Sequence, residues 1–120
     1  MLTLMQQPVA MVRGTTHTII ISLKDPAGNP RTLAADEVLR FGVKRFPEDN
    51  ACLITKELTT ANADENGDYL LILNPSDTIN LEHGTHYYDV GLQNGTTYDI
   101  VIPCSPFKIG ANISEAVINA

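Results

Sequence analysis

Tryptophan is absent from this chain, and long apolar runs and basic clusters are absent too. No apolar segment approaches the roughly 20 residues that a membrane-spanning helix requires. The N-terminus has neither the positive region nor the apolar run of a signal peptide. We therefore expect a protein that folds in a cytoplasm, does not enter a membrane, and reaches any external location by assembly or lysis.

Positive charge is in short supply. Lys and Arg number 8 against 14 Asp and Glu, which gives a formal net charge of −6. An acidic surface repels phosphate backbones. The few basic residues are scattered, apart from the adjacent pair Lys44 and Arg45. This composition argues against a nucleic-acid partner.

Cysteine is also rare, with Cys52 and Cys104 as the two examples. One disulfide between them is conceivable. In a chain without an export signal, two buried thiols are the favoured interpretation.

The clearest pattern that is present covers residues 81–109, where two strand-like segments flank Asn94-Gly95. Asn-Gly between alternating apolar residues is the strongest short-range signal for a β-hairpin. A buried face requires the apolar residues of both strands on one side. A two-residue Asn94-Gly95 loop, with Val90 opposite Asp99, would not achieve this. We therefore predict a three-residue loop, Gln93–Gly95, that pairs Val90 with Tyr98, Tyr88 with Ile100 and His86 with Ile102.

Further strands are expected over residues 2–5 and 8–12 (one strand broken near Pro8), 16–24, 38–46, 52–59 and 68–73. Single helical turns are expected at residues 33–37 and from Asn74 to about Asn80, where Asn, Pro and Asp suit a helix start. Pro103 and Pro106 should interrupt the last strand.

About seven short strands, with turn signals roughly every ten residues, are typical of an all-β, immunoglobulin-like antiparallel β-sandwich. A small closed barrel is the alternative. We expect one domain over residues 1–110 and a C-terminal tail over 111–120. The predicted core consists of Ile19, Ile21, Leu23, Leu39, Phe41, Val43, Leu71, Tyr88, Val90 and Ile100.

Residues that suggest chemistry do not combine into a site. His17, His83 and His86 are interpreted as surface or rim residues, since a spacing of three places His83 and His86 on opposite faces of a strand. Residues 62–67 resemble half of a calcium loop, but Asn62 and Leu73 occupy the first and twelfth positions, where acidic ligands are needed. A polar turn is favoured there. We predict no catalytic, cofactor-binding or metal-binding residues, no cofactor, and a protein that is not an enzyme.

The two adjacent tyrosines should point to opposite faces of their strand. Tyr88 shares a face with Val90 and belongs to the expected core. Tyr87 shares the other face with Asp89. Tyr87 is interpreted as a half-buried surface residue, with a contact residue as the alternative.

Three segments, in chain order, carry a family resemblance. They are Val12–Thr16 before the first long strand, Lys24–Pro30 followed by Leu33, and Leu73–Thr78 followed by Leu81, Gly84-Thr85 and Tyr87–Val90. These segments resemble the small Ig-like domains of bacteriophage tails and baseplates, nearest to the N-terminal domain of the phage baseplate upper protein. One departure is His86, at a position where such domains often carry a tyrosine.

The resemblance implies a non-enzymatic structural or docking module of a phage or prophage tail or baseplate, located in the virion. Its partners would be other phage particle proteins, with a homo-oligomer as a further option. The alternative is a carbohydrate-binding or adhesive Ig-like surface module. Residues 111–120 include Ile113, Val117 and Ile118, which would either fold back on the domain or pack on a neighbouring copy.

Overall fold

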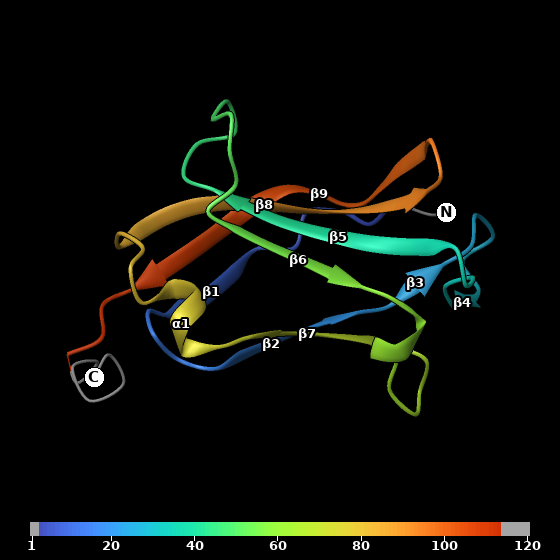
Figure 1. The fold of residues 1–120 in the computed structure, drawn as a ribbon, viewed down its shortest axis with the longest axis horizontal. Helices are drawn as coiled ribbons and strands as arrows, with labels where there is room; N and C mark the ends of the chain where they lie inside the picture. The colour runs from blue at the N-terminus through green and yellow to red at the C-terminus, as the bar shows by residue number, and fades with distance from the viewer. Residues whose placement is uncertain (1–2, 114–120) are drawn as a thin grey trace.

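A computed structural model describes residues 3–113 of the chain (Figure 1). Strands dominate these residues, because apolar side chains recur at every second position along most of them. The elements are β1 (Val9–Val12), β2 (His17–Ile21), β3 (Leu23–Lys24), β4 (Pro30–Arg31), β5 (Glu37–Lys44), β6 (Ile54–Leu58), the 3₁₀ turn η1 (Thr60–Asn62), β7 (Tyr69–Leu73), α1 (Pro75–Thr78), β8 (Gly84–Asn94) and β9 (Thr97–Gly110). The prediction of an all-β protein is confirmed.

The largest sheet has five strands in the order β1-β9-β8-β5-β6, and two small sheets pair β2 with β7 and β3 with β4. All pairs are antiparallel except β1 and β9, which run parallel. The expectation of a wholly antiparallel fold is therefore wrong at this pair. Parallel pairing is possible there because no tight hairpin joins β1 to β9.

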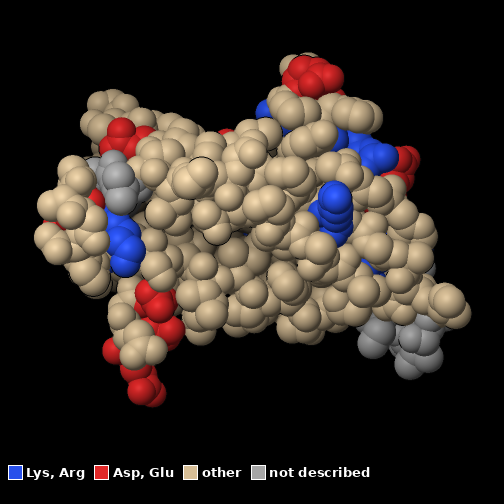
Figure 2. Space-filling view, turned by 180° about the vertical axis from the view of Figure 1, so that it is seen from behind, with Lys and Arg blue, Asp and Glu red and all other residues tan. Residues whose placement is uncertain are grey.

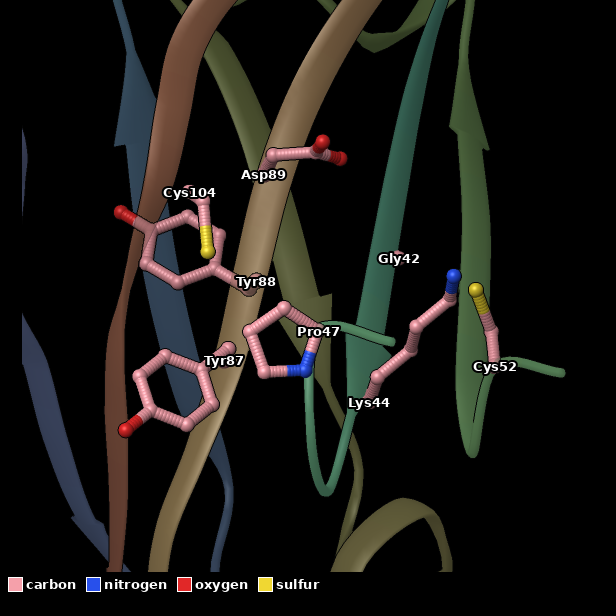
Figure 3. Close-up of a pocket in the computed structure, with 8 residues that line it drawn as sticks. All are labelled: Gly42, Lys44, Pro47, Cys52, Tyr87, Tyr88, Asp89 and Cys104. Atoms are coloured by element: carbon pink, nitrogen blue, oxygen red, sulfur yellow. The ribbon is translucent and has the colours of Figure 1, made fainter. Parts of the chain in front are cut away.

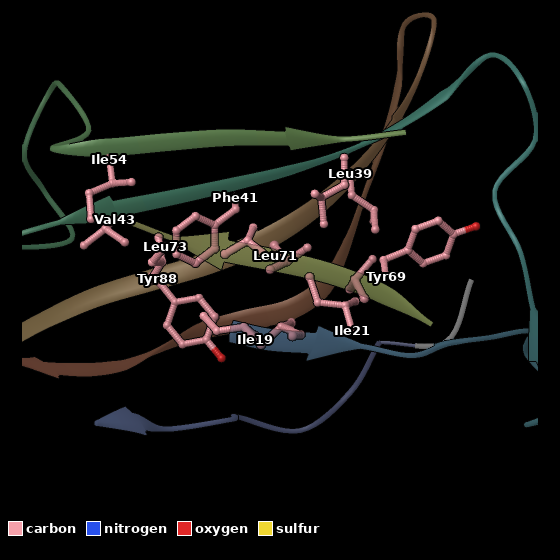
Figure 4. Close-up of a cluster of buried hydrophobic side chains, with 14 of the residues drawn as sticks. Ile19, Ile21, Leu39, Phe41, Val43, Ile54, Tyr69, Leu71, Leu73 and Tyr88 are labelled. Atoms are coloured by element: carbon pink, nitrogen blue, oxygen red, sulfur yellow. The ribbon is translucent and has the colours of Figure 1, made fainter. Parts of the chain in front are cut away.

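The core lies between the five-stranded sheet and the β2–β7 pair, with side chains from both pointing toward each other (Figure 4). Phe41 packs its ring against Tyr88 and Phe107, at centroid distances of 5.6 and 6.4 Å. Of the predicted core, only Ile100 is not buried. The buried members are Ile19, Ile21, Leu23, Leu39, Phe41, Val43, Leu71, Tyr88 and Val90.

The register of the β8–β9 hairpin differs from the prediction and explains Ile100. Asn94 pairs with Thr97, so the loop is Gly95-Thr96, and Val90 lies opposite Ile102. Gly95 has a φ of 59° while Thr96 has a negative φ, as in a hairpin turn with glycine at its first central position. Both registers considered from the sequence are wrong.

Two irregularities, between Tyr88 and Val90 and between Val90 and Gly91, then shift the strands relative to each other. As a result, Val101 and Ile102 are both buried although they are adjacent. The apolar phase of β9 changes at this point, so Tyr98 and Ile100 lie on the outer face of the sheet. A bulge of this kind cannot be recognised from alternation alone.

Two smaller expectations are also wrong. Residues 33–37 form a turn, with the Glu37 N–H donating to the Ala34 carbonyl at 3.1 Å, and Glu37 already begins β5. Strand β9 continues through Pro103 and Pro106. The prolines are tolerated because β1 pairs with β9 only from Phe107 onward. Their missing N–H groups therefore remove no hydrogen bond from the β1–β9 ladder.

The short helix after Asn74 is confirmed as α1. The Asn74 N–H donates to the Asp77 carboxylate at 2.7 Å, which satisfies a backbone group at the helix start. Among residues 3–113, no helix is long and apolar enough to cross a bilayer. Of the expected tail, residues 114–120 lie outside the described part of the chain. Asn112 is described, and its side chain donates to the Arg13 carbonyl at 2.9 Å.

Candidate functional site: a trough on the outer face of the sheet

A concavity lies on the outer face of strands β9, β8, β5 and β6 (Figure 3). Two adjoining hollows of about 280 and 440 Å³ share three lining residues, Gly42, Cys52 and Asp89. We call the combined hollow the trough. Its other principal lining residues are Arg40, Lys44, Pro47, Thr55, Glu57, Tyr87, Tyr98 and Cys104.

Two glycines shape the floor of the trough. A Cβ atom on Gly91 would lie 2.0 Å from the Tyr98 hydroxyl oxygen, and one on Gly42 would lie 3.0 Å from the Cys52 sulfur. The Tyr98 ring can therefore cross β8, and the Cys52 thiol can lie over β5, because neither glycine carries a side chain. Glycine inside a strand often marks such a close approach. This signal was present in the sequence and was missed.

Asp89 lies at the centre of the trough, opposite Gly42 on the neighbouring strand. Figure 3 shows its carboxylate between Tyr87 and Cys104 on one side and Lys44 and Cys52 on the other. Burial raises the pKa of Asp89, and nearby Lys44 partly opposes that rise. The Asp89 carboxylate makes no hydrogen bond or ion pair with another described residue. The trough thus holds a half-buried carboxylate whose oxygens are available as acceptors.

Arg40 closes one end of the trough by spanning three strands. Its guanidinium donates to Gln93 on β8 and to Glu57 on β6. These bonds keep the Arg40 side chain extended across the outer face of the sheet. The charge of Arg40 also acts on Tyr98, in the direction opposite to that of Asp89.

The three tyrosines of this region have different roles. Tyr88 points into the core, where its hydroxyl donates to the Gln7 carbonyl at 2.5 Å, and burial raises its pKa to about 12. Tyr87 is half-buried in the wall of the trough, as predicted from its face. Tyr98 is 51% exposed. Partial burial, reinforced by Asp89 and opposed by Arg40, raises the pKa of Tyr98.

The prediction of two free thiols is confirmed, but the expectation that they are buried is wrong. Cys52 and Cys104 are neither buried nor paired; both are free and exposed. Both line the trough, from opposite sides of Asp89 (Figure 3). Cys52 lies in the connection before β6, and Cys104 lies in the irregular segment of β9, so simple alternation does not indicate which side either residue faces.

The three histidines lie in different environments, and the interpretation of His86 as a surface or rim residue is wrong. His83 is exposed and His17 is half-buried, but His86 is a core residue with 1% of its surface exposed. Its Nε2 has no hydrogen-bond partner among the described residues, and its Nδ1 faces the Gly84 carbonyl at 3.4 Å. Burial lowers the pKa of His86, with Arg45 acting in the same direction against Gly84 and Glu82.

Residues 62–67 form the polar turn that was expected. Asp64 organises the turn, because its carboxylate accepts the N–H groups of Asn66 and Asp68 at 2.8 and 3.0 Å. Gly67 has a φ of 81°, a conformation that favours glycine. Across residues 3–113, no three His, Cys, Asp or Glu side chains are grouped closely enough to hold a metal ion.

The trough therefore offers hydrogen-bond acceptors, the cationic groups of Arg40, Lys44 and Lys56, and the phenol rings of Tyr87 and Tyr98, a composition suited to recognition. None of the residues that line the trough is a histidine. Comparisons with protein-family models, with curated proteins and with solved structures found no match to this chain.

Proposed function

We propose that this protein is a non-enzymatic docking module with an immunoglobulin-like sandwich fold. The strand order supports this proposal. Hairpins β5–β6 and β8–β9 join through β5 and β8 into one sheet, and β2 pairs with β7 in the other. In chain order, β2, β5, β6, β7, β8 and β9 correspond to strands B, C, C′, E, F and G. With this assignment, each strand has the neighbours expected in a variable-type immunoglobulin domain.

The trough is the observation that carries the docking role. Protein interfaces are enriched in tyrosine and arginine, and the trough presents Tyr87, Tyr98 and Arg40 around the carboxylate of Asp89. Its walls stand on paired strands, so a partner would bind a surface that is already ordered. Following the resemblance in the sequence, we assign the module to the tail or baseplate of a phage or prophage particle.

Mass spectrometry of particles purified from an induced host tests this assignment. The chain should be present at a constant ratio to the tail proteins. Its absence from intact particles would contradict the proposal.

A pair of matched variants tests whether the trough mediates docking. Tyr98→Ala should reduce incorporation into particles at least tenfold, because it removes the largest exposed ring of the trough. Phe46→Ala is the control, since Phe46 and Tyr98 are both 51% exposed and Phe46 does not line the trough. Equal incorporation of the two variants would exclude the trough as the docking surface.

The alternative, carbohydrate binding, is favoured by one arrangement within the trough. The half-exposed ring of Tyr98 lies near the Asp89 carboxylate, and the charge of Asp89 is felt at the Tyr98 hydroxyl. A sugar can place its C–H groups on a ring face and its hydroxyls on a carboxylate. NMR titration with neutral hexose oligosaccharides should then shift Tyr98 signals, and Asp89→Asn should abolish the shift.

A further inference from the structure

Strand β2 has one edge without a backbone partner. It pairs with β7 along its whole length, from His17 opposite Leu73 to Ile21 opposite Tyr69. On its other side, no backbone hydrogen bond joins β2 to another described residue. The N-terminal segment, which would be the nearest source of a partner, lies instead along β9, with the Leu4 N–H donating to the Val101 carbonyl at 2.7 Å.

A groove marks this open edge. It has a volume of about 250 Å³ and separates β2 from the N-terminal segment. All five residues of β2 line one wall, and the core residues Tyr88 and Ile102 also contribute to the lining. No Asp, Glu, Lys or Arg occurs among the residues that line it: Leu4, Gln7, Pro8, Val9, Tyr88, Ile102 and those of β2.

The β2 edge also lacks the features that usually prevent strands from pairing between molecules. Proteins commonly protect such edges with charged side chains, proline or bulges. The two edge strands of the larger sheet have such features: β6 carries Lys56 and Glu57, and Pro8 directly precedes β1. Strand β2, with the sequence His-Thr-Ile-Ile-Ile, has none of them.

The solvent-facing side of the β2–β7 pair is apolar. Ile20 is 62% exposed and Ile72 is 50% exposed, on adjacent strands of the same small sheet. Strands β2 (His-Thr-Ile-Ile-Ile) and β7 (Tyr-Leu-Leu-Ile-Leu) contain no Asp, Glu, Lys or Arg. The back view of the molecule shows charged side chains in only a few places, with much uncharged surface between them (Figure 2). A second copy of this acidic chain can therefore approach the β2–β7 pair without strong repulsion from these strands.

We propose that the β2 edge pairs antiparallel with the β2 edge of a second copy of this chain. A single strand edge is self-complementary in the antiparallel direction, so one two-fold axis satisfies both copies at once. The result is a continuous four-stranded sheet, β7-β2-β2-β7, that covers both grooves and joins the two Ile20 and Ile72 surfaces. This inference goes beyond the docking function and does not depend on the phage assignment.

The interface is small, because each strand contributes only five residues. Such a contact falls below the roughly 1,200 Å² of a stable complex. We therefore expect a dissociation constant between about 10 μM and 1 mM. In an assembled particle, a high local concentration would favour the same contact.

Analytical ultracentrifugation of the full chain over a concentration series tests the proposal. Wild type should shift from monomer to dimer. Ile20→Lys should weaken the dimer at least tenfold, because the two introduced charges lie opposite or diagonal to each other across the axis. Ile72→Lys is the matched control: it makes the same change on the same face but one strand away from the edge, and it should leave the dimer intact.

A charge exchange distinguishes pairing from a loss of folding. Ile20→Lys and Ile20→Glu should each be monomeric with the wild-type denaturation midpoint, and their mixture should form a heterodimer.

Three results would overturn the proposal: a wild-type monomer at about 1 mM, equal effects of Ile20→Lys and Ile72→Lys, or a dimer that is lost on deletion of residues 111–120 but not in Ile20→Lys. The last result would identify the C-terminal tail as the occupant.

Discussion

At the level of single residues, the trough and the core depend on positions where a side chain is missing or has no hydrogen-bond partner. Gly91 leaves space for the Tyr98 ring above β8. Asp89 keeps free acceptor oxygens at the centre of the trough, and His86 keeps an unsatisfied nitrogen in the core. Each of these features can be tested with one substitution.

Gly91→Ala should displace Tyr98 from the trough. The new Cβ would lie 2.0 Å from the Tyr98 hydroxyl oxygen, but the half-exposed ring can rotate into solvent, so the loss of stability should stay within about 1 kcal/mol. The raised pKa of Tyr98 should then return toward its ordinary value, because burial and the proximity of Asp89 cause the rise. An NMR pH titration of the ring, assigned with Tyr98→Phe, measures this. An unchanged Tyr98 pKa would show that the ring does not lie over Gly91.

His86 should make the free energy of unfolding depend on pH near neutrality. Its pKa is lowered in the folded protein, mainly by burial, so between the folded value and about 6.5 the unfolded chain binds the extra proton. Stability therefore falls as the pH decreases from about 7.5 through 6.5 and levels off below the folded pKa. His86→Leu should flatten this slope in urea titrations at several pH values. His83→Gln, at an exposed position, should retain it.

At the level of elements, the β8–β9 hairpin shows how a turn and its strands set register together. Asn94-Gly95 correctly indicated a hairpin, but Gly95 occupies the first central position of the loop, not the second. The bulges further along the strands then reverse the phase of β9. As a consequence, the outer half of the hairpin presents Tyr98 and Ile100 to the trough side, and the inner half presents Ile102 and Phe107 to the core.

Gly95→Ala tests this turn. Gly95 has a φ of 59°, and an L-residue in that region costs about 1–2 kcal/mol. We expect a loss of stability in that range, with faster amide exchange at both ends of the loop. Thr96→Ala is the control, because Thr96 has a negative φ and should change stability by less than about 0.5 kcal/mol. Equal losses in the two variants would mean that the loop is placed incorrectly.

At the level of the whole molecule, one core joins the two facing sheets, so damage to its centre should unfold the entire domain. Phe41 is 3% exposed and contacts the rings of Tyr88 and Phe107. Phe41→Ala should cost about 3–5 kcal/mol, a large part of the stability of a small domain. Urea denaturation should show one transition at a much lower midpoint. A midpoint close to wild type would contradict this view of the core.

Much of the fold follows from local patterns in the sequence. Alternation in His17–Leu23 and Leu39–Val43 determined which face of each strand is buried, because side chains alternate strictly along a regular strand. The helix start at Asn74 and the turn at Asp64 were also evident, since both depend on contacts between residues close in sequence.

The tertiary structure alone decided the rest. The trough arises where Gly42 of β5, Asp89 of β8, and Tyr98 and Cys104 of β9 meet, and their proximity depends on register and bulges that no local pattern records. The same is true of the buried His86. The open edge of β2 exists because the N-terminal segment pairs with β9, a choice between two sheets that depends on long-range packing. Local sequence determines which residues face inward; strand pairing determines which residues become neighbours.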